Sequence, residues 1–415
     1  MTEISSETLI LELARSLHAC GSPAYELDQR MEQVATSLGR SATFFSTPTA
    51  LFVTFDDDID QGTRLMRVYP GDTNLRRYAE LFELQAAIQD EDLQPPEAWQ
   101  RLQQINSAAD GYSKVVEVAA YAIVGACVAV LVGGNSVVIA ASGAIGLIVG
   151  GLVVGLAALR LQLHLVNVIA GFVASTLACL VQVFIEASNF ELTVLSSLIV
   201  LVPGLYLTIS INELATQNLA SGTARIAGAI TTLLTMIFGV YMGRGIVAAF
   251  HAVPLSVAPS TPTLLASAIV IIPTGLCFAA LFRTRYRDVP WLLLATVIAF
   301  STMRLAAEFV SSFAAVWIAS VVAGIVSHVI TRRLRLPSAV MLMPALILLV
   351  PGSIGFSGMA QIMLQDDLPG GIRLVATMML TSVAIVAGLL LTDALAPNQN
   401  LATQKPATQK PTSNA

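Results

Sequence analysis

Two hydrophobic patterns divide the chain near residue 114. Before this point apolar residues alternate with polar ones at helical or strand spacing, and after it they fill segments of about 20 residues. Elements with one apolar face suit a soluble domain, whereas long apolar segments suit helices surrounded by lipid. The pattern therefore predicts a soluble domain over residues 1–114, a membrane domain after it, and a disordered tail over residues 395–415.

The soluble domain is predicted to be a small α+β unit. "SSETLILELARSLHACG" and "SPAYELDQRMEQVATSLG" each combine a capping serine, apolar residues at helical spacing and a final glycine. "TALFVTF" and "TRLMRVY" predict two strands on either side of an acidic turn at residues 56–62. Helical spacing returns over residues 72–90 and 95–108.

Ten segments after residue 114 are apolar enough to cross a bilayer, which requires about 20 residues per helix. They are residues 116–133, 136–158, 164–185, 191–211, 223–243, 263–282, 288–303, 306–330, 338–360 and 371–392. The widest gap, between the fifth and sixth segments, separates two groups of five, over residues 115–246 and 260–394.

A Val-Pro-Gly triplet interrupts the fourth segment of each group. The sequence reads "LIVLVPGLYL" at residues 198–207 and "LILLVPGSIG" at residues 346–355. Because five helices cross the membrane an odd number of times, two consecutive copies enter it from opposite sides. We therefore predict an α-helical integral membrane protein with ten transmembrane helices, arranged as two five-helix inverted repeats behind the α+β domain.

Each triplet predicts a break in its helix. Proline has no N–H, its ring clashes with the carbonyl four residues earlier, and the glycine that follows permits unwinding. Freed N–H groups suit a carboxylate and freed carbonyls suit an ammonium group. Pro203, Gly204, Pro351 and Gly352 are therefore candidates for binding a zwitterionic amino acid, with two purely structural kinks as the alternative.

Polar residues follow both breaks. Asn212 and Glu213 lie nine and ten residues after the first proline, and Arg225 opens the next helix, so an ion pair between Glu213 and Arg225 is plausible. The alternative is an ordinary interfacial pair. In the second group Gln361, which cannot titrate, takes the position of Glu213. We expect proton coupling at Glu213 and Arg225, and substrate binding at Pro203, Gly204, Asn212, Pro351, Gly352, Ser353 and Gln361.

The charge distribution predicts which side each segment faces. Ten Lys and Arg residues fall in the loops on the side of the N-terminus, leaving Lys114 aside, and three in those on the other side. Short cytoplasmic loops are enriched in these residues. Both termini are therefore expected in the cytoplasm, with the protein in the inner (plasma) membrane.

Composition narrows the function classes. The chain is 55% hydrophobic and 12% charged, and the first 114 residues carry 18 acidic and 9 basic residues, which argues against nucleic-acid binding. The four cysteines lack metal-site or disulfide spacing, and no GxSxG, HExxH or phosphate-binding loop occurs. We expect no metal, no cofactor and no enzyme, with an intramembrane hydrolase as the minor alternative.

Several longer stretches together resemble one family. "CGSPAYELDQRMEQVATSLG", "FFSTPTALFVTF", "TRLMRVYPGDTNL" and "LVPGLYLTISINELATQNLASGTARIAGAI" look like the threonine/serine exporter (ThrE) family, and "LPSAVMLMPALILLVPGSIGF" looks like its C-terminal domain. The likeness covers residues 7–392. It places the family's break on Pro203 and Gly204, its acidic residue, more usually Asp, on Glu213, and its arginine on Arg225.

The resemblance implies a secondary transporter that exports L-threonine and L-serine, driven by the proton motive force. Two-chain relatives are associated with dicarboxylate export, so succinate-like substrates are the alternative. The expected partners are the substrate, protons and membrane lipid, and the sequence leaves a homo-oligomer open.

Overall fold

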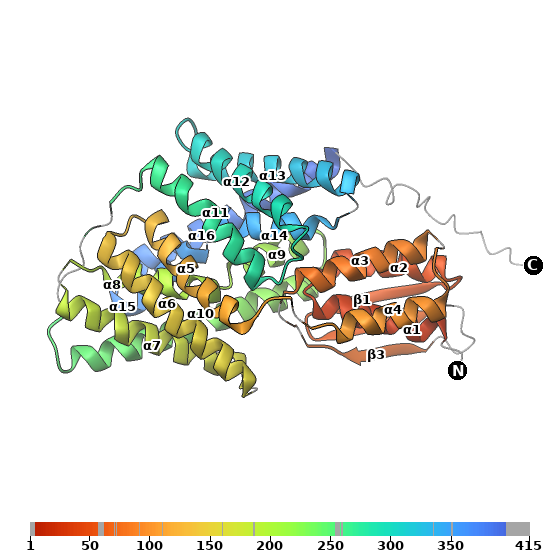
Figure 1. Cartoon of the computed structure of the whole chain (residues 1–415), viewed down its shortest axis with the longest axis horizontal. Coiled ribbons are helices and arrows are strands. Elements are labelled where there is room, and N and C mark those ends of the chain that lie inside the picture. The colour runs from red at the N-terminus through yellow and green to blue at the C-terminus, as the bar shows by residue number, and fades with distance from the viewer. Residues whose placement is uncertain are drawn as a thin grey trace, which may run out of the picture.

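The N-terminal region predicted as a soluble domain and a helical bundle lie at opposite ends of the molecule's long axis (Figure 1). The computed structural model describes residues 5–56, 62–69, 71, 73–90, 92–109, 111–159, 161–185, 187–253, 258, 260–334, 336–349 and 352–395. The predicted tail, apart from residue 395, and most of the acidic turn lie outside these residues. The last helix of the first region ends at Ser107, and the first helix of the bundle begins at Lys114.

The soluble domain contains four helices and one three-stranded sheet. Its elements are α1 (Ser6–Ala19), α2 (Ala24–Ser37), β1 (Ala42–Thr47), β2 (Ala50–Phe55), β3 (Thr63–Arg67), α3 (Leu75–Gln89) and α4 (Pro95–Ser107). The strands form an antiparallel meander in the order β1-β2-β3. The sequence predicted the four helices and the last two strands, but β1 was missed.

Alternation along β2 fixes which face of the sheet is buried. Leu51, Val53 and Phe55 are fully buried, whereas the residues between them are partly exposed. The buried residues join one core with apolar residues of all four helices. This core also includes Ala339, Val340 and Met343 of the membrane domain, so the soluble domain is packed onto the bundle.

The bundle follows the ten predicted segments closely. Its helices are α5 (Lys114–Leu131), α6 (Ser136–Ala158), α7 (Leu163–Phe184), α8 (Phe190–Leu198), the short 3-10 turn η1 (Ile199–Leu201), α9 (Gly204–Ala215), α10 (Leu219–Ala248), α11 (Leu264–Leu281), α12 (Val289–Ala306), α13 (Ser312–Leu334), α14 (Ser338–Leu349), α15 (Gly352–Leu364) and α16 (Leu368–Leu395). Within the described residues, nine helices are long and apolar enough to span a membrane, or ten if the bent pair α8–α9 counts as one span. The chain is a multi-pass membrane protein.

Glycines allow α7 and α10 to touch backbone to backbone. A Cβ added at Gly171 would lie 2.3 Å from the Met236 carbonyl oxygen, and one at Gly239 would lie 2.1 Å from that of Val168. Small residues at such crossings let transmembrane helices approach closely, which increases van der Waals contact where lipid offers no hydrophobic driving force.

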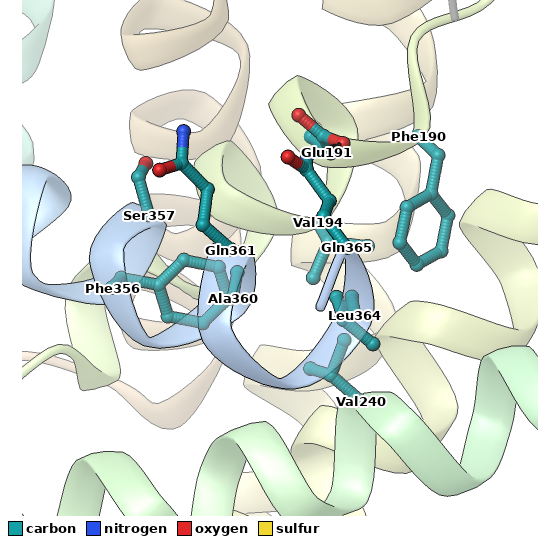
Figure 2. A pocket seen from close by; sticks show the side chains of 10 residues that line it. All are labelled: Phe190, Glu191, Val194, Val240, Phe356, Ser357, Ala360, Gln361, Leu364 and Gln365. Carbon is teal, nitrogen blue, oxygen red and sulfur yellow. Dashed lines mark hydrogen bonds between the residues drawn. The ribbon is translucent and has the colours of Figure 1, made fainter. Parts of the chain in front are cut away.

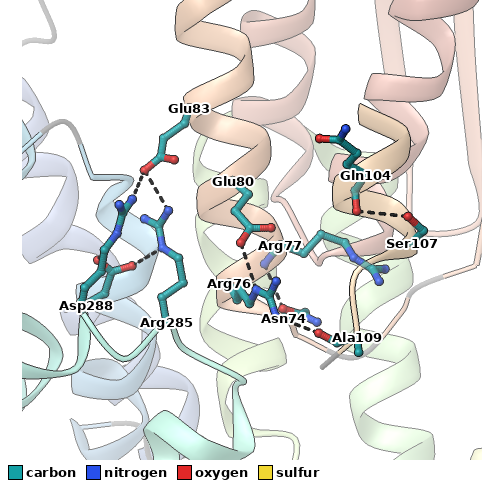
Figure 3. Close-up of polar contacts among 11 residues, drawn as sticks. Asn74, Arg76, Arg77, Glu80, Glu83, Gln104, Ser107, Ala109, Arg285 and Asp288 are labelled. Carbon is teal, nitrogen blue, oxygen red and sulfur yellow. Dashed lines mark hydrogen bonds and ion pairs between the residues drawn. The ribbon is translucent and has the colours of Figure 1, made fainter. Parts of the chain in front are cut away.

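Ion pairs also attach the soluble domain to the second half of the bundle (Figure 3). Glu83 of α3 accepts a hydrogen bond from Arg285 Nη1 at 2.8 Å and pairs with Arg287, both in the turn between α11 and α12. Arg285 also binds Asp288 through Nε at 2.6 Å. Next to these ion pairs, the Leu75 N–H at the start of α3 donates to the carbonyl of Phe282 at the end of α11 (2.9 Å). The N-terminal end of α3 thereby caps the C-terminal end of α11.

These ion pairs predict that substitution of Arg285 destabilises the fold more than substitution of Glu83. Asp288 is only 3% exposed, so Arg285→Gln would leave a buried carboxylate without its main counter-charge, which costs about 3–5 kcal/mol. Glu83→Gln removes a more exposed partner and is expected to cost about 1 kcal/mol. Thermal unfolding in detergent measures both, with Arg101→Gln on the exposed face of α4 as the matched control. Equal destabilisation by the three variants would contradict this account.

Candidate functional site

The first Pro-Gly pair breaks its helix as predicted. The segment Phe190–Leu201 and helix α9 meet at an angle of 58°. Val202 is extended (φ −67°, ψ 123°), and α9 begins at Gly204. Pro203 cannot supply the N–H that the carbonyl of Ile199 would receive in a continuous helix. This carbonyl instead accepts from the Val202 N–H at 3.2 Å.

Local hydrogen bonds engage the polar backbone groups next to this break. The Gly204 N–H donates to the carbonyl of Val202 at 2.8 Å, and the Leu207 N–H donates to that of Pro203 at 3.2 Å. In this conformation the Gly204 N–H is therefore engaged within the chain. Binding of substrate through this group would require the turn to open.

The second predicted break falls partly outside the described residues. Helix α14 ends at Leu349 and α15 begins at Gly352, while Val350 and Pro351 lie outside the described residues. Together the two helices form one candidate span, Ser338–Leu364, whereas α8 and α9 form a bent pair. The predicted inverted repeat therefore remains a prediction, and so does the role of Pro351.

The first break lies against the start of α15 inside the bundle. A Cβ added at Gly352 would lie 3.0 Å from Val202 Cγ1 and 3.1 Å from Gly204 Cα. Pro203, Gly204 and Gly352 are all buried, so irregular backbone is enclosed by protein, as it must be in a membrane. Ser353, the next residue of α15, is half-buried. The fold thus brings together candidates that the sequence separates by about 150 residues.

One hollow lies between α8, α10 and α15 (Figure 2). Figure 1 draws α8 and α15 at the end of the bundle away from the soluble domain. The predicted residue Gln361 lines it, beside Ser357 of the same helix. At its edge Gln365 donates to Glu191 of α8 at 2.5 Å, which joins the two half-helices. Sequence reasoning missed Gln365 because the contact depends on how α8 and α15 pack.

A second hollow lies between the soluble domain and the half-helices α9 and α14. His18 and Thr73 of the soluble domain line it together with Tyr206 of α9 and Arg225 of α10. The packed breaks therefore have a small space on either side. Neither hollow contains Asn212 or Glu213.

Glu213 lies beneath the soluble domain and has no solvent-exposed surface. Its Oε1 accepts from Arg225 Nε at 3.0 Å and from the Ala24 N–H at 3.0 Å. Arg225 is itself 9% exposed. The predicted pair thus forms, and it is buried at a domain junction instead of lying in an open loop.

The junction places a carboxylate at the start of helix α2. Pro23 precedes this helix without a side-chain cap, so the first N–H groups need an acceptor from elsewhere. Glu213 supplies one and also favours the positive end of the helix dipole. Next to it the Asn212 Nδ2 group donates to the Tyr25 hydroxyl at 3.0 Å. No sequence pattern indicated that α2 is the partner of this segment.

Burial perturbs several titratable groups of the soluble domain. It raises the pKa of Asp28 to about 6, despite hydrogen bonds from Ser46 that favour the charged form. It lowers the pKa of His18, and it raises the pKa of the Cys20 thiol to about 12. A thiol this hard to ionise is a poor nucleophile. The described residues contain no group of three or more His, Cys, Asp and Glu side chains placed to hold a metal ion.

Comparison with known families finds two matches. Residues 8–247 match the family described as "Putative threonine/serine exporter" (ThrE), and residues 264–395 match the one described as "Threonine/Serine exporter, ThrE". No curated protein and no solved structure matches the chain. The two matches cover the soluble domain and both groups of membrane helices.

The contact between Glu213 and α2 predicts local protection of the helix start. Glu213→Ala removes the acceptor of the Ala24 N–H, whereas Glu213→Gln keeps a carbonyl oxygen in its place. We expect hydrogen exchange in the first turn of α2 to become at least tenfold faster in the alanine variant and to change less in the glutamine variant. Glu117→Ala, at the start of α5, is the control. Unchanged exchange in both Glu213 variants would rule out this cap.

The raised pKa of Asp28 predicts a pH-dependent stability difference. Between about pH 4 and 6 the folded chain binds a proton that the unfolded chain releases, so wild-type stability falls as pH rises through this window. Asp28→Asn is therefore expected to be more stable than wild type at pH 7.5 by about 1–2 kcal/mol, after a discount for partial exposure. Thermal unfolding should show the gap closing towards pH 4. A gap independent of pH would contradict the shift.

Proposed function

Because the chain belongs to the threonine/serine exporter family, we propose that it exports L-threonine and L-serine as a proton-coupled secondary transporter. The path runs between the two broken spans, from the soluble-domain side to the other side. We place the soluble domain and both termini in the cytoplasm, and the bundle in the inner membrane. The observation that carries this proposal is the contact between the first break and Gly352 at the start of α15, with a hollow on either side of it.

This arrangement suits alternating access. The half-helices α9 and α14 border the hollow next to the soluble domain, and α8 and α15 border the opposite one. Rocking at the breaks would widen one hollow while the other closes, and each glycine lets the backbone bend without a side-chain clash. The inverted relation of the two groups is part of this proposal.

Proton coupling is assigned to Glu213 with Arg225 as its partner. Protonation of Glu213 would remove the charge that balances Arg225 and weaken the hold of α9 on helix α2. Asp28 is a second candidate, because its pKa of about 6 lies near physiological pH. Both groups lie on the soluble-domain side, where a proton would be exchanged with the cytoplasm.

The charges beside the hollows favour an amino acid over a dicarboxylate. The residues that line the two hollows include one fixed cation, Arg225, and one acidic residue, Glu191. A dicarboxylate would require a second cation, and Glu191 would repel it. A zwitterion carries one carboxylate, which the single cation Arg225 can balance, and it has no net charge for Glu191 to repel. Hydrolysis has no support from an ionisable nucleophile at Cys20.

Reconstitution into proteoliposomes tests the proposal. Wild type should move L-threonine and L-serine with saturable kinetics, and collapse of an imposed proton gradient should slow this transport. Succinate should neither be moved nor compete. Saturable transport of succinate without threonine or serine would refute the substrate assignment, and transport unaffected by the gradient would refute the coupling.

A paired glycine substitution tests the role of the breaks. Gly352→Ala places a methyl group 3.0–3.1 Å from Val202 and Gly204, so the crossing must widen, and threonine transport is expected to fall about tenfold. Gly151→Ala on α6 is the matched control, because an added Cβ there meets no described atom within 4 Å. Equal threonine transport by the two variants, at equal expression, would show that the breaks are not part of the transport path.

A further inference from the structure

The hollow beside the soluble domain is bordered by a ready-made carboxylate site. Arg225 Nε and the Ala24 N–H both donate to one oxygen of Glu213, each at 3.0 Å. These two donors come from different domains and converge on one point. Arg225 also lines the hollow, so the residue that pairs with Glu213 borders the same space. The chain thus fills an anion site with its own carboxylate.

His18 offers the opposite chemistry on the same hollow. Its Nε2 lies 2.8 Å from the Thr47 carbonyl oxygen, which can only accept, so Nε2 carries the proton. Burial lowers the pKa of His18 and keeps the ring neutral, which leaves a lone pair on Nδ1. His18 is 4% exposed, and Nδ1 has no hydrogen-bond partner among the described residues. A buried acceptor without a donor is costly unless a ligand supplies one.

We propose that this junction is the site where the amino acid is loaded before export. The substrate carboxylate replaces that of Glu213 at Arg225 and the start of α2, and the substrate ammonium group donates to His18 Nδ1. This inference rests on the proposed function and gives its substrate a position. Glu213 acts as an internal substitute for the substrate carboxylate and keeps the empty site closed.

The size of the hollow agrees with a closed, unloaded state. It has room for about one water molecule, too little for threonine. Loading therefore requires Glu213 to leave Arg225 and the soluble domain to move away from α9. Since Glu213 joins the two domains, its displacement by substrate would release the soluble domain from the inner half-helix. Substrate binding and opening of the path would then be one event.

The Glu213→Gln variant is expected to bind L-threonine more tightly than wild type does. If Glu213 competes with the substrate, Glu213→Gln weakens the competitor and should tighten L-threonine binding about threefold to tenfold. If Glu213 only supports the fold or contacts the substrate directly, the same variant should weaken binding. The sign of the change separates these roles.

Equilibrium binding of radiolabelled L-threonine to the purified full-length chain in detergent is the test. Arg225→Gln and His18→Phe should each weaken binding at least tenfold, and His18→Gln should weaken it less because an amide can donate to Thr47 and also accept. Arg101→Gln is the matched arginine control. Thermal unfolding of each variant confirms folding.

Two analogues test the site in the wild-type chain, so the result does not depend on a variant that folds poorly. L-threoninol lacks the carboxylate and 3-hydroxybutyrate lacks the ammonium group, and each should compete at least tenfold more weakly than L-threonine. Arg225→Gln should not weaken L-threoninol further. Full competition by either analogue would overturn the inference.

The outcomes separate this inference from the proposed function. Wild-type binding by Arg225→Gln and His18→Phe, together with saturable threonine transport, would overturn the loading site and leave the exporter proposal intact. Weaker binding by a folded Glu213→Gln variant would overturn the competitor role. A wild-type chain that neither binds nor transports threonine and serine would overturn both.

Discussion

The contact between the α8–α9 break and the start of α15 inside an apolar bundle is the constraint on which the rest of this structure depends. A broken helix exposes polar backbone, and lipid offers no partner for it. The fold meets this requirement by placing Val202 and Gly204 against Gly352 and by rebonding the first break locally. Helices α8, α9 and α15 thereby meet at one point, and the two hollows lie between these helices and their neighbours.

A second constraint acts at the soluble-domain end of this arrangement. Glu213 is a fully buried carboxylate, and such a group is tolerated only when counter-charge and hydrogen bonds surround it. Arg225 supplies the charge, and the Ala24 N–H supplies a donor from another domain. The membrane domain therefore completes the start of helix α2, and the soluble domain completes the environment of Glu213. Neither part satisfies this junction alone.

The soluble domain contacts both groups of membrane helices. Ala24 and Tyr25 hold α9 in the first group, while Glu83 holds the turn between α11 and α12 in the second. A rearrangement that moves one group relative to the other must strain or break one of these attachments. The domain is thus placed to restrain such motion, and its release from α9 would be a natural step in opening.

Local physical rules explain what the sequence determined by itself. Bilayer thickness and the need to satisfy every backbone group set the length of each span, so the apolar segments of the sequence predicted the candidate spans of the described residues, nine of them or ten with the bent pair α8–α9. Because Pro203 has no backbone N–H to donate, the helix is interrupted at the predicted place, and α9 begins at Gly204. Glu213 and Arg225 are 12 residues apart around one turn, which made their pairing predictable. Strand β1 was missed because only Phe44 and Ser46 are buried in "ATFFST", so its hydrophobic alternation is weak.

Tertiary structure alone decided how the parts meet. Ala24 and Glu213 are 189 residues apart, and Glu83 and Arg285 are 202 apart, so no periodic pattern links them. These contacts arise because two independently patterned bodies dock, and docking depends on the shape and charge of whole surfaces. Whether a buried carboxylate faces lipid, water or the start of a distant helix is settled only when those surfaces come together.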